Sequence, residues 1–159
     1  MGCSSSQPAE TPELAEYFEL VPHEDFQEKI VLIHGSRRNT LQWLPRSPVK
    51  AVVVVSHGLH EHGLRYYALA HALTALNYAV YAIDHYAHGK SDGTRGLISD
   101  GQILPRDFKQ YAQSVRQLHP DVPFFVLCHS MGTLIALNAL NDMPYVKVVM
   151  TIALPLTVG

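Results

Sequence analysis

Apolar runs of strand length recur through the second two thirds of the chain. Such runs are typical of strands that are buried on both faces of a parallel sheet. They predict strands over Ala51–Ser56, Tyr78–Asp84, Phe124–Leu127 and Val146–Leu154, and the segments between them predict helices over Arg65–Leu76, Phe108–Leu118 and around Leu134–Leu137. Because strands alternate with helices, we predict an α/β fold with a mostly parallel, doubly wound sheet.

The N-terminal part of the chain has a different pattern. Residues 1–16 are rich in serine, proline and glutamate, a composition typical of a linker. Short strand-like pieces separated by turn residues follow, at Tyr17–Val21, Lys29–Ile33 and Thr40–Leu44. They predict two or three antiparallel strands at one edge of the sheet. We therefore expect an acidic tail over residues 1–16 and one domain over residues 17–159.

Composition narrows the class of protein. A chain of 159 residues that is 47% hydrophobic can bury the core of one globular domain, and no run reaches the ~18–20 apolar residues that a membrane span needs. Residues 1–28 contain seven of the fourteen acidic residues and no Lys or Arg, so they carry −7 and the remainder carries +5. This gives no support to nucleic-acid binding. The two cysteines, Cys3 and Cys128, do not form a disulfide framework and indicate a reduced, intracellular setting.

The first six residues match the signal for N-myristoylation. In Met1-Gly2-Cys3-Ser4-Ser5-Ser6 the acceptor would be Gly2 after removal of the methionine, and Cys3 beside it is placed for palmitoylation. One myristoyl chain binds a membrane only marginally, and the tail has no basic residues, so a stable anchor needs the second acyl chain. We expect lipid anchoring at the cytoplasmic face of a membrane. The alternative is a serine-rich start in which both residues are accidental.

Ser130 lies where the predicted strand Phe124–Leu127 turns directly into a helix. Residues Cys128–Gly132 read as a G-x-S-x-G nucleophile elbow whose first glycine is replaced by cysteine. In so sharp a turn the backbone of the central residue is strained, and its side chain projects above the sheet. Ser130 is therefore the candidate nucleophile.

A glycine-containing loop, His57–Gly63, follows the strand Ala51–Ser56, and we call it the oxyanion loop. An oxyanion hole in this kind of fold uses one N–H from the residue after the nucleophile and one from an early strand-to-helix loop. These positions predict Met131 and Leu59 as the two donors. No cofactor is expected for this chemistry.

Other readings of these polar residues are less favoured. The histidines of the oxyanion loop with Glu61 do not have the spacing of a zinc-binding helix, so we expect no metal; they are expected to bond to nearby backbone, with Glu61 orienting one of them. Asp84 follows a buried strand, where α/β sheets place their ligands. It comes too early in the chain for the acid of a triad, and a structural carboxylate is favoured.

Taken together, the motifs resemble those of α/β-hydrolases of the monoacylglycerol lipase type, a group that also includes lysophospholipases and the serine aminopeptidase S33 domain. The matching residues, over about residues 50–155, are His57-Gly58-Leu59 with Glu61-His62 and Arg65-Tyr66, Asp84-His85 with His88-Gly89-Lys90-Ser91, and His129-Ser130-Met131-Gly132. The resemblance implies a serine hydrolase of acyl glycerols or related lipid esters. Where the family has glycine, this chain has His60, Ala87, Cys128 and Thr133.

The resemblance also implies that an acid and a histidine follow the nucleophile along the chain. The 27 residues after Gly132 contain Asp142 and no histidine. We therefore expect the N-terminal part of an α/β-hydrolase, with little activity in this form and a possible missing C-terminal half. The alternatives are a non-catalytic membrane-tethered binding module, or a peptidase or thioesterase on the same fold.

Overall fold

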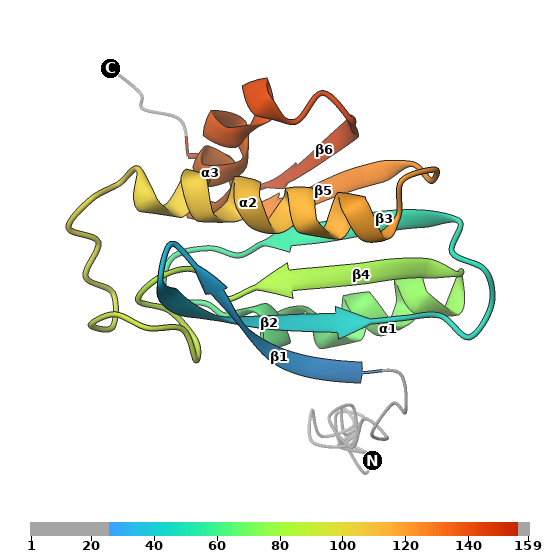
Figure 1. The fold of residues 1–159 in the computed structure, drawn as a ribbon, viewed down its shortest axis with the longest axis horizontal. Helices are drawn as coiled ribbons and strands as arrows, with labels where there is room; N and C mark the ends of the chain where they lie inside the picture. The colour runs from blue at the N-terminus through green and yellow to red at the C-terminus, as the bar shows by residue number, and fades with distance from the viewer. Residues whose placement is uncertain (1–25, 156–159) are drawn as a thin grey trace, which may run out of the picture.

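The computed structural model describes residues 26–155, which form one mixed sheet flanked by helices (Figure 1). Its strands lie in the order β1-β2-β4-β3-β5-β6. Their bounds are β1 Phe26–Ile33, β2 Ser36–Trp43, β3 Ala51–Ser56, β4 Tyr78–Ile83, β5 Phe124–His129 and β6 Val146–Ile152. Strands β3 to β6 are parallel, whereas β1 and β2 form an antiparallel hairpin at one edge. This confirms the predicted fold class; the predicted strand Tyr17–Val21 lies outside the described residues.

Helices cover both faces of the sheet. The helical segments are η1 Gly63–Tyr66, α1 Tyr67–Ala75, α2 Ile103–Leu118, α3 Met131–Ala139 and η2 Leu140–Asp142. α1 lies on one face, and α2 and α3 lie together on the other (Figure 1). None of these helices, within residues 26–155, is long and apolar enough to cross a membrane.

The side chains of β3 show why its apolar run predicts a central strand. Val52 and Val54 pack into the core under α2 and α3, whereas Val53 and Val55 pack into the core under α1. Each of the four is at most 1% exposed. A strand with a core on both faces needs apolar side chains at every position rather than at alternate ones.

Helix α2 begins five residues earlier than predicted, at Ile103 rather than Phe108. Pro105 lies in its first turn, where a backbone N–H has no partner within the helix, so the proline costs no hydrogen bond. The longer helix places Asp107 against β2, where its carboxylate accepts hydrogen bonds from the buried Arg38 guanidinium at 2.8 and 2.6 Å. The sequence pattern gives no sign of this pair.

Strand β6 is less buried than its apolar sequence predicts. It pairs with β5 on one side and is the last strand of the described sheet. Val148, Met150 and Ile152 are 48%, 37% and 50% exposed. Its sequence is that of an interior strand, but its place in the described fold is an edge.

Candidate active site

Ser130 occupies a sharp turn between β5 and α3. Its backbone angles are φ 48° and ψ −119°, outside the regions that L-residues favour, and α3 begins at Met131. The Ser130 N–H donates to the Ile152 carbonyl of β6 at 2.9 Å, and its own carbonyl accepts from Thr133 at 2.9 Å. The serine therefore precedes the helix in the strained conformation of a nucleophile elbow.

Gly132 lets α3 cross β3 at very short range. A Cβ atom at this position would lie 2.6 Å from the His57 carbonyl oxygen and closer still to that of Ser56. Both atoms belong to backbone, which cannot move aside as a side chain could. Because Gly132 has no side chain, the nucleophile elbow can pack directly against the start of the oxyanion loop.

The oxyanion loop lies beside the nucleophile elbow. A Cβ atom built on Gly58 would be 2.7 Å from Nδ1 of His129, the residue before Ser130. Leu59 is the next residue of the loop and is 48% exposed, and Met131 is half-buried at the start of α3. The fold thus brings the segments that carry Ser130, Leu59 and Met131 to the carboxyl-terminal edge of the parallel strands.

Glu61 joins these two segments. Its Oε2 accepts a hydrogen bond from the Gly58 N–H at 2.9 Å and from the Tyr66 hydroxyl at 2.9 Å, and lies 3.1 Å from Nδ1 of His129. Burial favours the neutral carboxyl, but these bonds outweigh it and lower the pKa of Glu61. We expected Glu61 to orient a histidine of its own loop; it bonds His129 instead, which is 68 positions away and which no sequence pattern links to it.

Of the histidines in the oxyanion loop, His57 bonds to neighbouring backbone, as expected. Nδ1 of His57 lies 2.8 Å from the Gly58 carbonyl, and Nε2 of His57 accepts the His85 N–H at 3.0 Å. Nε2 of His85 lies 3.0 Å from the Ser56 hydroxyl. Within residues 26–155 no three His, Cys, Asp or Glu residues are grouped so that they could hold a metal ion.

The hydrogen bond that Nε2 of His57 accepts requires a neutral imidazole. Burial lowers the pKa of His57 to about 4, although the Gly58 carbonyl and the Asp84 carboxylate favour its charged form. Burial, together with the neighbouring His57, lowers the pKa of His85 well below its ordinary value. Both rings are at most 1% exposed, so protonation would place a charge in the core.

The folded domain is therefore expected to lose stability in mild acid. His57 binds a proton below about pH 6.5 when unfolded but only near pH 4 when folded. The stabilisation is thus complete above pH 6.5 and is lost as pH falls toward 4, by roughly 3 kcal/mol for this one group. Urea unfolding at pH 7.5, 5.5 and 4.5 would measure it. His57→Asn should reduce the dependence of the unfolding free energy on pH, and an equal dependence in the wild-type and variant proteins would contradict the assignment.

Asp84 is a structural carboxylate, as the sequence favoured. Its oxygens accept the N–H groups of Gly63 at 2.6 Å and Lys90 at 2.9 Å, and the side-chain amide of Asn39 at 2.9 Å. Asp84 is 2% exposed. It ties the end of the oxyanion loop to the loop that follows β4, and these bonds occupy it.

Four residues stand where the α/β-hydrolases that this sequence resembles have glycine, and the structure accommodates them in two ways. His60 and Ala87 adopt φ values of 59° and 62°, the left-handed conformation that glycine takes most easily. Cys128 and Thr133 keep helical or extended backbone but are fully buried. Burial raises the pKa of the Cys128 thiol to about 12, so that residue packs rather than reacts.

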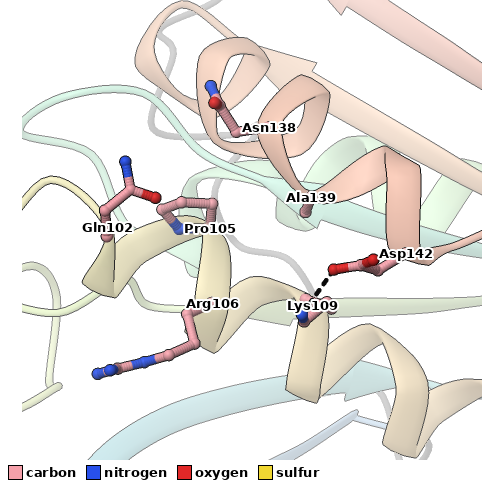
Figure 2. Close-up of a pocket in the computed structure, with 7 residues that line it drawn as sticks. All are labelled: Gln102, Pro105, Arg106, Lys109, Asn138, Ala139 and Asp142. Atoms are coloured by element: carbon pink, nitrogen blue, oxygen red, sulfur yellow. Dashed lines mark hydrogen bonds and ion pairs between the residues drawn. The ribbon is translucent and has the colours of Figure 1, made fainter.

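Pockets of similar volume differ in whether they adjoin the candidate site. One, of about 260 Å³, is lined by Glu61, Arg65, Tyr66, His129 and Ile152 and so adjoins the nucleophile elbow. Another, of about 220 Å³, opens between α2 and the end of α3, where Lys109 and Asp142 form an ion pair at 2.7 Å (Figure 2). The second pocket includes none of Ser130, Leu59 or Met131 in its lining.

A parallel sheet that places a strained serine at a strand-to-helix turn, beside a glycine-containing loop from the neighbouring strand, defines the α/β-hydrolase fold. Residues 47–155 match the family model described as serine aminopeptidase, S33, and the chain belongs to this family.

Relatives agree with this assignment. The chain is 39% identical to mouse monoglyceride lipase over 140 residues, which is 88% of the chain and 44% of that protein. It is 39% identical to a monoacylglycerol lipase of Mycolicibacterium smegmatis over 90 residues, 57% of the chain and 32% of that protein. A carboxyl esterase of Bacillus coagulans shares the fold, with a TM-score of 0.71 at 24% identity over 79% of this chain and 43% of that one. The chain spans less than half the length of these proteins.

Proposed function

We propose that the chain carries the nucleophile half of a lipid-ester serine hydrolase that acts on monoacylglycerols. Ser130 is the nucleophile in this proposal, and the N–H groups of Leu59 and Met131 stabilise the oxyanion. The observation that carries it is the strained backbone of Ser130, φ 48°, at a turn fixed by the close approach of Gly132 to β3. The substrate class is taken from the monoglyceride lipases to which the chain is similar.

The nucleophile also needs a base. Within residues 26–155, His129 is engaged with Glu61 and His57 is bonded to backbone at both ring nitrogens, so neither is available to Ser130. We propose that the histidine and acid come from a C-terminal segment equivalent to the part of the relatives that this chain does not match. Loss of the base costs a serine protease on the order of 10⁶ in kcat, so the 159-residue chain should be close to inactive.

Fluorophosphonate labelling tests the nucleophile. The chain should be labelled slowly and only at Ser130, and Ser130→Ala should abolish the label, as mass spectrometry of the labelled peptide would show. A chimera that adds the unmatched C-terminal part of mouse monoglyceride lipase should label faster by several orders of magnitude and hydrolyse a monoacylglycerol. Equal labelling of Ser130→Ala, or a folded chimera that labels no faster, would favour a non-catalytic binding module.

We further propose that Gly2 and Cys3, which lie outside the described residues, are acylated and hold the domain at the cytoplasmic face of a membrane. The support is the match of the first six residues to the acylation signal. In eukaryotic cells fed alkynyl myristate and alkynyl palmitate, the wild-type chain should take up both. Gly2→Ala should lose the myristate and Cys3→Ser the palmitate; a wild-type chain that carries neither label would end this part of the proposal.

A further inference from the structure

One carboxylate oxygen connects three segments around the candidate active site. Oε2 of Glu61 receives the Gly58 N–H from the oxyanion loop, the Tyr66 hydroxyl from η1 and lies within hydrogen-bond distance of His129 at the end of β5. The Glu61 side chain is only 10% exposed. Three hydrogen bonds to one largely buried carboxylate oxygen are stronger and more directional than hydrogen bonds to water would be.

The position of the Gly58 N–H matters because Leu59 comes next. The Leu59 N–H lies in the same planar peptide as the Gly58 carbonyl, which accepts a hydrogen bond from the Glu61 N–H. The Glu61 carboxylate holds the preceding peptide through the Gly58 N–H, so Glu61 bonds both peptides that flank Gly58. The loop after it is strained, since His60 has φ 59°, and it closes through a long hydrogen bond of 3.2 Å from Glu61 N–H to the Gly58 carbonyl. Nδ1 of His57 contacts the Gly58 carbonyl and Asp84 holds the far end of the loop at Gly63, whereas the Glu61 carboxylate accepts the Gly58 N–H itself.

The other end of the connection lies directly before the nucleophile. His129 precedes Ser130, and its Nδ1 approaches both Glu61 and the position where Gly58 lacks a side chain. The same oxygen therefore sets the distance between the loop that carries Leu59 and the turn that carries Ser130. Arg65 contacts only the other oxygen, Oε1, at 3.4 Å and is 66% exposed, so it adds little to this connection.

We propose that Glu61 is a positioning residue for the reaction of Ser130, which holds the oxyanion loop against the nucleophile elbow by bonding Gly58, Tyr66 and His129 through one oxygen. This proposal rests on the proposed function of Ser130. Glu61 touches no reacting atom in it; it fixes the Leu59 N–H where the oxyanion forms. Oxyanion donors are effective only when they are held in place before the charge develops.

The test compares Glu61→Gln and Tyr66→Phe in the full 159-residue chain, with Asp142→Asn as the matched control. Asp142 makes an ion pair with Lys109 at 2.7 Å, and its side chain is 63% exposed. We expect Glu61→Gln to slow fluorophosphonate labelling of Ser130 about tenfold or more, since it exchanges charged for neutral hydrogen bonds. Tyr66→Phe, which leaves the carboxylate in place, should have a smaller effect, and Asp142→Asn should have none.

Amide hydrogen exchange provides the readout that general destabilisation would not reproduce. In Glu61→Gln the Gly58 amide should exchange at least tenfold faster, while the amides of β3 and β5 keep their wild-type protection. Slower labelling with an unchanged Gly58 amide, or a faster-exchanging Gly58 amide with unchanged labelling, would overturn the proposal. If neither the wild-type chain nor the chimera is labelled at Ser130, the function proposed for Ser130 fails, and the exchange of Gly58 alone decides whether Glu61 holds the loop.

Discussion

Replacing Gly132 with alanine is expected to disrupt the nucleophile elbow and to destabilise the domain by at least ~3 kcal/mol. The added methyl group would lie 2.6 Å from the His57 carbonyl oxygen and nearer to that of Ser56. Inserted groups in close-packed interiors cost ~1–3 kcal/mol when side chains can adjust, and here the obstacle is the backbone of a central strand. Urea unfolding followed by circular dichroism measures the loss, and fluorophosphonate labelling of Ser130 should disappear with it.

The matched control for this substitution is Gly101→Ala. A Cβ atom on Gly101 would have no neighbour within 4 Å, so its unfolding free energy should stay within about 0.5 kcal/mol of wild type. The comparison separates the effect of the close crossing from the general effect of adding a methyl group. Equal stability of the two variants would show that α3 does not depend on close contact with β3.

Replacing Asp107 with alanine is expected to cost ~3–5 kcal/mol, because it leaves the Arg38 guanidinium buried without its counter-ion. Arg38 is fully buried, and its remaining hydrogen bonds go to the Ser36 hydroxyl at 2.8 Å and the Arg37 carbonyl at 2.9 Å. Such a loss is a large share of the ~5–15 kcal/mol by which domains are stable. It should appear as a lower urea midpoint and a lower Tm.

Two further variants show that burial, rather than charge alone, sets this cost. Lys109 lies on α2, as Asp107 does, and forms an ion pair near the surface with Asp142 of η2 (Figure 2). Asp142→Ala breaks this pair and should cost less than ~1 kcal/mol. Combining Asp107→Leu with Arg38→Met removes both charges and should recover most of the stability. If Asp107→Ala were no more harmful than Asp142→Ala, the buried pair would not contribute as the structure indicates.

The sequence predicted the elements of this fold well where one local rule governs them. Ala51–Ser56 appears as β3 with the predicted bounds, because a strand buried on both faces needs apolar residues at every position. The start of α2 was placed five residues too late, because Pro105 is unfavourable within a helix but harmless in its first turn. Val146–Leu154 has the apolar run of a buried strand, but in the described sheet β6 is the last strand and pairs with β5 alone, so several of its side chains are partly exposed.

The candidate site divides in the same way. The motif around Ser130 and the glycines of the oxyanion loop predicted which segments would meet, because each depends on backbone conformations that few residues adopt. The bonds of Glu61 to His129, and of Arg38 to Asp107, join residues 68 and 69 positions apart. No periodicity or spacing relates such residues, so only the fold could reveal them.

By itself the sequence determined the order of strands and helices along the chain, the turn at which Ser130 stands and the family to which the chain belongs. The tertiary structure decided which polar groups are paired: which carboxylate fixes the oxyanion loop, which histidines are neutral and which ion pair is buried. The physical reason is that backbone preferences act between neighbours in the chain, whereas hydrogen bonds and desolvation depend on distances that exist only after the sheet has formed.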